Sequence, residues 1–85
     1  MTPSMSPERL EACWAFGAAA LAVMAVGDEV AAAGQTPDPV ASAYAELLEA
    51  HRGLRRLFAR GAVEGVAEAA LSVLVQAERT RTLLS

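Results

Sequence analysis

The stretch that decides the fold of this chain is residues 12–27, ACWAFGAAALAVMAVG, in which none of the sixteen side chains is charged. On a helix, with 100° between successive residues, the large side chains in and around this stretch gather on two opposite faces. The first face carries Leu10, Cys13, Trp14, Leu21 and Met24, and the second carries Phe16, Val23, Val26 and Val30. Because a helix that is apolar on all sides is buried in a core or a membrane, we predict that this one needs more than one neighbour.

Cap and turn residues on either side of this stretch place the helix ends. Ser6 and Pro7 are typical of a helix start, because serine caps free N–H groups and proline is tolerated in the first turn. Gly34 ends the helix, and Asp38 is expected to cap the next one. We predict a disordered tail at residues 1–5 and one helical domain at residues 6–85, with helices at about 6–33, 39–60 and 62–84.

The boundary between the second and third helices is the weakest in the sequence, because only Gly61 and Gly65 mark it. We predict two separate helices, with a single long bent helix as the alternative. Both segments carry side chains spaced alternately four and three residues apart, which is typical of helices that pack in a bundle. The second contributes Val40, Tyr44, Leu47, His51, Leu54 and Phe58; the third contributes Val63, Val66, Ala70, Val73, Ala77, Thr80 and Leu84, with Leu71 and Leu74 widening its stripe.

The chain has 85 residues, and a core of that size is marginal without a further source of stability. The single cysteine, Cys13, excludes a disulfide within the chain, and the single histidine, His51, leaves too few ligands for a typical zinc site. Association between chains is the remaining means of stabilisation. We therefore predict an all-α fold, a small antiparallel bundle of three helices (two if the second and third are continuous), completed by dimerisation.

One face of the first helix is expected to pack on its own chain and the other on a partner, and which face does which stays open. Tryptophan is favoured at binding hot spots, and small residues such as Gly17 let a second helix approach closely. The residues predicted to contact a second copy or another protein are Trp14, Phe16, Val23, Val26 and Val30. We predict a non-catalytic helical protein that acts by protein–protein interaction, as a subunit, adaptor or inhibitor, and that associates as a homodimer.

Side chains suited to catalysis are sparse. No serine or cysteine has an identifiable base, no carboxylate pair lies opposite a histidine, and no glycine-rich loop joins a strand to a helix. The Glu-x-x-His motif of di-metal bundles is absent as well. We expect no enzymatic activity, no cofactor and no metal. Cys13 and His51 are predicted to be packing residues, with a pH-sensitive contact across a dimer interface as the alternative for His51.

Four arginines, Arg52, Arg55, Arg56 and Arg60, gather near the end of the second helix and could contact a phosphate or another anion. They are more typical of a solvated helix end, where the dipole favours cations. The net charge of −3 and the absence of lysine also argue against general nucleic-acid binding. A nucleic-acid-binding regulator that uses these arginines is kept as an alternative.

The uncharged stretch is sixteen residues long, against the roughly 20 residues that span a bilayer. We expect a buried core helix rather than a membrane helix, and keep a small membrane-associated subunit as an alternative. The first five residues carry no basic side chain, so we expect no secretory signal and a cytoplasmic location. The twenty alanines, and arginine as the only strongly basic residue, are typical of a GC-rich genome, which indicates a bacterial or phage origin.

Overall fold

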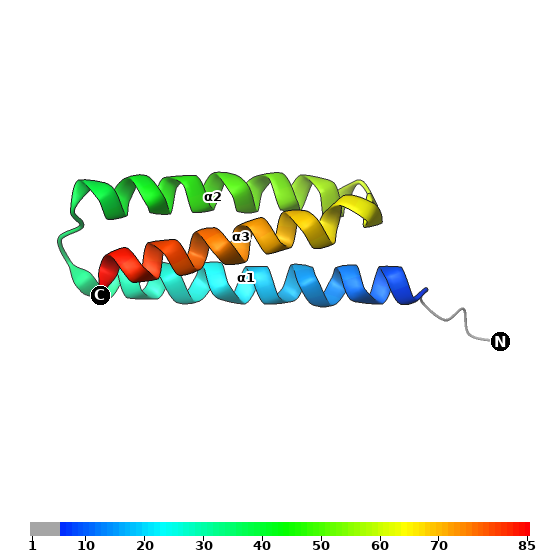
Figure 1. The fold of residues 1–85 in the computed structure, drawn as a ribbon, viewed down its shortest axis with the longest axis horizontal. Helices are drawn as coiled ribbons and strands as arrows, with labels where there is room; N and C mark the ends of the chain where they lie inside the picture. Colours follow the sequence, from blue (N-terminus) through cyan, green and yellow to red (C-terminus); the bar gives the residue numbers. More distant parts are fainter. Residues whose placement is uncertain (1–5) are drawn as a thin grey trace.

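The computed structural model describes residues 6–85 and contains three helices that run up, down and up along a narrow rod (Figure 1). They are α1, Pro7–Ala33; α2, Asp38–Ala59; and α3, Val63–Leu84. The rod measures 54 × 18 × 17 Å. α1 and α3 run parallel, and α2 runs antiparallel to both. The predicted all-α bundle of three helices is confirmed, and the tail predicted at residues 1–5 lies outside the described residues.

The ends of α1 follow from its cap residues. Ser6 Oγ accepts a hydrogen bond from the Arg9 N–H at 3.2 Å, and Pro7 lies in the first turn. At the other end Gly34 has a φ of 77°, a left-handed value that glycine adopts without steric cost. α2 begins differently from the prediction, because Asp38 is its first residue and no side chain caps it. In the first turn, the Asp38 carboxylate still interacts favourably with the positive end of the helix dipole.

Gly61 separates α2 from α3. Its φ is 75°, and the Gly61 N–H donates to the Phe58 carbonyl at 3.1 Å, which closes the end of α2. The Ala62 N–H donates to the Leu57 carbonyl at 3.1 Å and completes the turn. A left-handed residue cannot continue a right-handed helix. The predicted separation of the two helices is therefore present, and the alternative of one bent helix is wrong.

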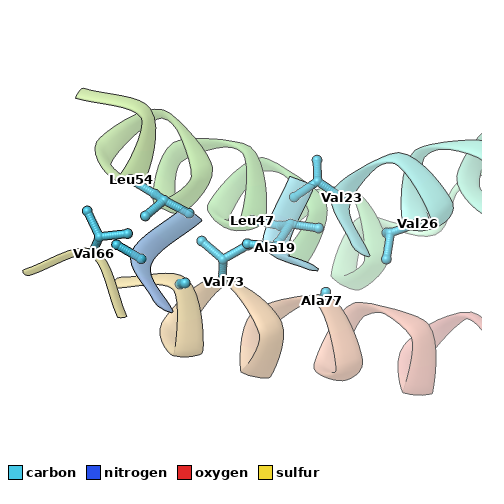
Figure 2. Close-up of a cluster of buried hydrophobic side chains, with 10 residues drawn as sticks. Ala19, Val23, Val26, Leu47, Leu54, Val66, Val73 and Ala77 are labelled. Carbon is cyan, nitrogen blue, oxygen red and sulfur yellow. The ribbon is translucent and has the colours of Figure 1, made fainter. Parts of the chain in front are cut away.

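Small side chains make up most of the core between the helices (Figure 2). The buried residues are Ala12, Ala19, Val23, Val26, Val40, Ala43, Leu47, Leu54, Val66, Ala70, Val73, Ala77 and Thr80. Within this buried set only Leu47 and Leu54 are larger than valine, so the helices can approach closely. Most positions on α2 and α3 follow the predicted spacing, with two exceptions. Phe58, at the end of α2, is 36% exposed, and Leu71 is 61% exposed because it lies beyond the edge of the α3 stripe.

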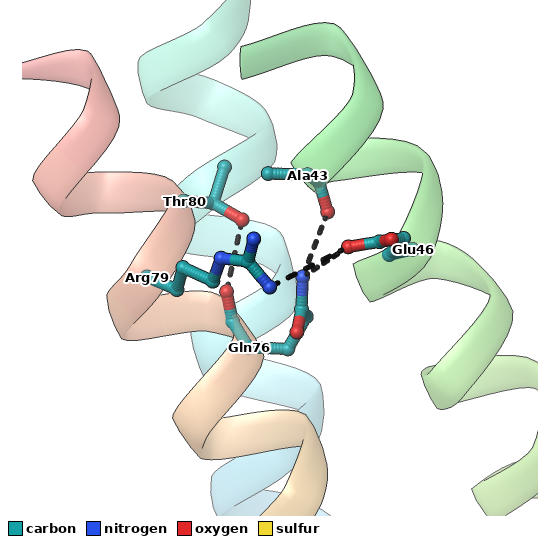
Figure 3. A network of polar contacts seen from close by, with 5 residues as sticks. All are labelled: Ala43, Glu46, Gln76, Arg79 and Thr80. Atoms are coloured by element: carbon teal, nitrogen blue, oxygen red, sulfur yellow. Dashed lines mark hydrogen bonds and ion pairs between the residues drawn. The ribbon is translucent and has the colours of Figure 1, made fainter. Parts of the chain in front are cut away.

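α3 holds the bundle together, because it packs along both other helices while α1 and α2 touch each other much less. Polar contacts follow the same pattern. Gln76 Nε2 donates to Glu46 Oε2 at 3.1 Å and to the Ala43 carbonyl at 3.4 Å, which links α3 to α2 (Figure 3). Arg81 pairs with Glu29 of α1 at 3.1 Å. Exposed pairs of this kind contribute less than about 1 kcal/mol each, so they set the register of the helices more than their stability.

Candidate functional site

The two apolar faces of α1 lie in different surroundings. The face with Val23 and Val26 is turned inward, since Val26 exposes no surface and Val23 exposes only 8%. Phe16 and Val30 lie half-buried against the same core. Four of the five residues predicted to form an interface therefore pack against their own chain, Val23 and Val26 fully and Phe16 and Val30 in part. Trp14 is the exception, and it lies on the opposite face.

The inward face is closed on the α2 side by aromatic rings. The Phe16 ring stacks on the Phe58 ring, with centroids 4.2 Å apart and an angle of 6° between the planes, and its centroid lies 6.3 Å from that of His51. His51 Nε2 is buried without a hydrogen-bond partner among the described residues. This burial, together with the positive charge of Arg55, lowers the pKa of His51. His51 therefore packs against its own chain, in keeping with the packing role predicted for it.

The opposite face of α1, which we call the outer face, consists of Leu10, Trp14, Gly17, Leu21 and Met24. Trp14 is 74% exposed, Leu21 69%, Met24 65% and Leu10 50%. In the most apolar window of α1 only 22% of the residues are buried. The chain therefore presents its largest aromatic side chain and three large aliphatic ones to the surroundings from a single helix.

A hollow of about 330 Å³ lies on the outer face, open to the outside and lined almost wholly by apolar atoms. Gly17, Trp14 and Leu21 are among the residues that line it. A Cβ built on Gly17 would meet nothing within 4 Å, so packing within the chain does not require glycine there. Gly27 differs, because its Cβ would come within 3.0 Å of the Tyr44 hydroxyl. Since glycine inside a helix costs about 1 kcal/mol relative to alanine, Gly17 is unexplained by the isolated chain.

The spacing of the outer face is that of a coiled-coil seam. Its residues lie alternately four and three positions apart, from Leu10 through Trp14, Gly17, Leu21 and Met24 to Asp28. The same spacing identified the packed stripes of α2 and α3 from sequence. The inner face of α1 has the same spacing, through Phe16, Ala19, Val23, Val26 and Val30, so the spacing alone does not say which face is exposed. The sequence prediction therefore left Leu10, Leu21 and Met24 out of the interface.

A smaller apolar patch lies on α3. Leu71 is 61% exposed and Val75 is 62% exposed, and the four-residue interval between them puts both on one flank of the helix. Ala67 and Glu78 share this flank, and each lines a depression together with residues of α1. The patch therefore lies on the side of α3 that adjoins α1.

The four arginines singled out in the sequence are all exposed. Arg52, Arg55 and Arg56 line one open depression of about 460 Å³ on α2, and Arg60 does not contribute to it. The Arg52 guanidinium is paired with Glu49 at 3.0 Å, so part of the positive charge is already neutralised. The depression presents two further arginines to an anion.

Two further observations bear on the kind of site. Within residues 6–85, histidine, cysteine and carboxylate side chains form no group of three or more that could hold a metal ion. In the same part of the chain, α1 is the one helix long and apolar enough to cross a membrane by length and composition alone, a test that core helices of soluble proteins also pass. No family model, curated protein or solved structure significantly matches this chain. The outer face of α1 is thus the feature from which a function is best argued.

Proposed function

We propose that this protein is a non-catalytic interaction protein, which binds a helix of another protein chain through the outer face of α1. The observation that carries the proposal is the exposure of Trp14, Leu21 and Met24 on one coiled-coil seam. Full burial of a large apolar side chain is worth about 1.5–3 kcal/mol, and these side chains are less than half buried by their own chain. A helix laid along the seam would recover most of that free energy.

Insertion into a membrane is the second candidate, and the low burial of α1 is the observation that favours it. The charge distribution favours a protein partner instead. Asp28 ends the apolar seam, and Glu8, Glu11 and Glu29 lie elsewhere on the same helix. With a net charge of −3, the protein is also repelled by anionic lipid surfaces. The outer face is a stripe along one helix, with acidic residues at both ends of that helix, and this shape suits one partner helix better than a bilayer.

The depression on α2 supports nucleic-acid binding less well. It offers two arginines with no ion-pair partner among residues 6–85, beside one that is paired with Glu49, whereas a nucleic-acid surface usually carries an extended basic face. Replacing Arg55 and Arg56 by glutamate would abolish binding of that kind. The same double variant should leave binding through the outer face intact.

Affinity capture from cells that express this chain tests the proposal with two matched variants. Leu21→Glu places a charge in the middle of the outer face, while Arg55→Glu with Arg56→Glu alters the depression on α2. We expect the wild-type protein and the arginine variant to retain the same protein partner, which can be a second copy of this chain. Leu21→Glu should lose that partner while its own helix content stays unchanged. Retention by Leu21→Glu would contradict the proposal, as would stable association of the wild-type protein with lipid vesicles.

A further inference from the structure

On the basis of the proposed function, we infer that the occupant of the outer face is the outer face of a second copy, with the two α1 helices antiparallel about a two-fold axis. Identical chains associate most often through such two-fold contacts, in which the same patch meets itself. Three properties of the outer face support this occupant: its spacing, the sizes of its side chains, and the charge at its end.

The spacing sets which residues meet. Coiled-coil seams have two kinds of apolar position, a and d, and in an antiparallel pair each a position faces a d position. Trp14, Leu21 and Asp28 fall at a, and Leu10, Gly17 and Met24 fall at d. The facing pairs are then Trp14 with the partner's Met24, Leu21 with the partner's Gly17, and Asp28 with the partner's Leu10.

The sizes of the facing side chains are complementary in this arrangement. The hollow above Gly17 is the place that the partner's Leu21 would fill, and the same contact occurs twice because of the symmetry. Gly17, which the isolated chain does not require, is thereby explained. Trp14 meets the flexible thioether of the partner's Met24, a favourable sulfur–aromatic contact. Beside the axis lie Ala18 and Ala20, small enough to let the two backbones approach closely.

The charge at the end of the seam also favours the antiparallel arrangement. Asp28 would lie beside the first turn of the partner's α1, where the helix dipole is positive. Glu8 and Glu11 of that turn line a depression with α3, so they point away from the outer face. A parallel pair would set Asp28 against the partner's Asp28 and Gly17 against the partner's Gly17, which gives like-charge repulsion and an unfilled gap.

Substitution of two glycines tests whether the second copy fills the hollow. Gly17→Leu fills it from within, and Gly53→Leu is the matched control, because a Cβ at either position meets nothing within 4 Å. In sedimentation equilibrium we expect the wild-type protein and Gly53→Leu to be dimers at micromolar concentration, and Gly17→Leu to be a monomer with the same helix content. A wild-type protein that remains a monomer at high micromolar concentration would overturn the inference, as would a dimer of Gly17→Leu.

Disulfide crosslinking tests the direction and register. In a Cys13→Ser background, Ala18→Cys should form a crosslinked dimer on mild oxidation, because the two copies of position 18 lie close to the two-fold axis. Leu10→Cys should not, since its two copies would be about 27 Å apart along the axis at 1.5 Å per residue. Efficient crosslinking through Leu10→Cys would indicate a parallel pair and overturn the inference.

The fluorescence of Trp14 helps to distinguish failure of this inference from failure of the proposed function. Trp14 is the only tryptophan in the chain, so the emission of the purified protein reports on the outer face. Formation of the dimer should shift its emission to the blue as the concentration rises. If the protein stays a monomer while affinity capture retains another protein that Leu21→Glu loses, the second copy is wrong and a protein partner still stands. If the Trp14 emission shifts on addition of phosphatidylcholine vesicles alone, both are overturned.

Discussion

The inner and outer faces of α1 are both apolar, yet they differ almost completely in burial. Val26 on the inner face exposes none of its surface, while Trp14 on the outer face exposes 74%. The inner face contributes alanine and valine to a core whose α3 side is also built from alanine and valine, such as Ala70 and Val73. Close packing of small side chains leaves no room for an indole ring. Burial in this bundle therefore follows the fit of side chains, and hydrophobicity alone does not decide which face is covered.

The sharpest way to break the comparison is to place the same charge on each face. Val26→Asp buries a carboxylate without a partner, which costs several kcal/mol, about as much as the whole stability of a small domain. We expect this variant to be largely unfolded at 25 °C. Met24→Asp puts the carboxylate at an exposed position and should leave the fold intact. Far-ultraviolet circular dichroism with urea titration measures both, and equal losses would show that the two faces do not differ as described.

Gly17 and Gly27, the two glycines of α1, allow a comparison with a smaller expected change in the free energy of unfolding. Gly17→Ala should raise the free energy of unfolding of the monomer by about 0.5–1 kcal/mol, because alanine is the better helix former and its Cβ has open space. Gly27→Ala should gain less, because the new Cβ would press on the Tyr44 hydroxyl at 3.0 Å. Combining Gly27→Ala with Tyr44→Phe removes that hydroxyl, and the free energy of unfolding should then rise as much as in Gly17→Ala. Denaturant titration at concentrations below dimer formation checks the order, and an equal gain at both glycines would contradict it.

The smallest expected effect is the pH dependence of folding stability that arises from His51, which packs on the inner face. Burial and the Arg55 charge lower the pKa of His51 in the folded state below its ordinary value of 6.5. As the pH falls below about 6.5, His51 therefore binds a proton in the unfolded chain before it does so in the folded protein. The free energy of unfolding falls with pH over this range, until the pH is below the pKa of His51 in the folded state. Above that window this group contributes no pH dependence. The free energy of unfolding of wild type, compared with His51→Gln between pH 8 and 5, should show this decline only in the wild type.

Sequence reasoning predicted most of the fold, because helix ends and core stripes are local properties. Ser6 and Gly34 act as predicted, and Leu47, Leu54 and Val73 are buried where the four-and-three spacing placed them. The assignment of the α1 faces could not be predicted in the same way. Periodicity gives the angle between two faces but does not say which of them the other helices will cover. That choice depends on the side chains that α2 and α3 bring to it.

Only part of the candidate site could be predicted, because the sequence does not say which face of α1 is covered. Trp14 is predicted to be an interface residue because tryptophan is favoured at binding hot spots, and it is exposed. Phe16 is predicted as a member of the opposite apolar face, but its ring stacks on Phe58 of the same chain. Such a contact joins residues far apart in the sequence, and no local pattern reveals it. Gly17 had a readable signal, because a glycine among the large apolar residues of a seam requires a reason.

The central place of α3 has a consequence for how the protein is made. α3 is the last of the three helices to be synthesised, yet it contacts both of the others far more than they contact each other. While the ribosome is still adding residues 63–85, α1 has neither of its apolar faces covered by a complete bundle. We expect a chain that stops short of α3 to expose these faces to chaperones and proteases and to be degraded rather than accumulate. The bundle can close only once α3 is free to pack along both α1 and α2.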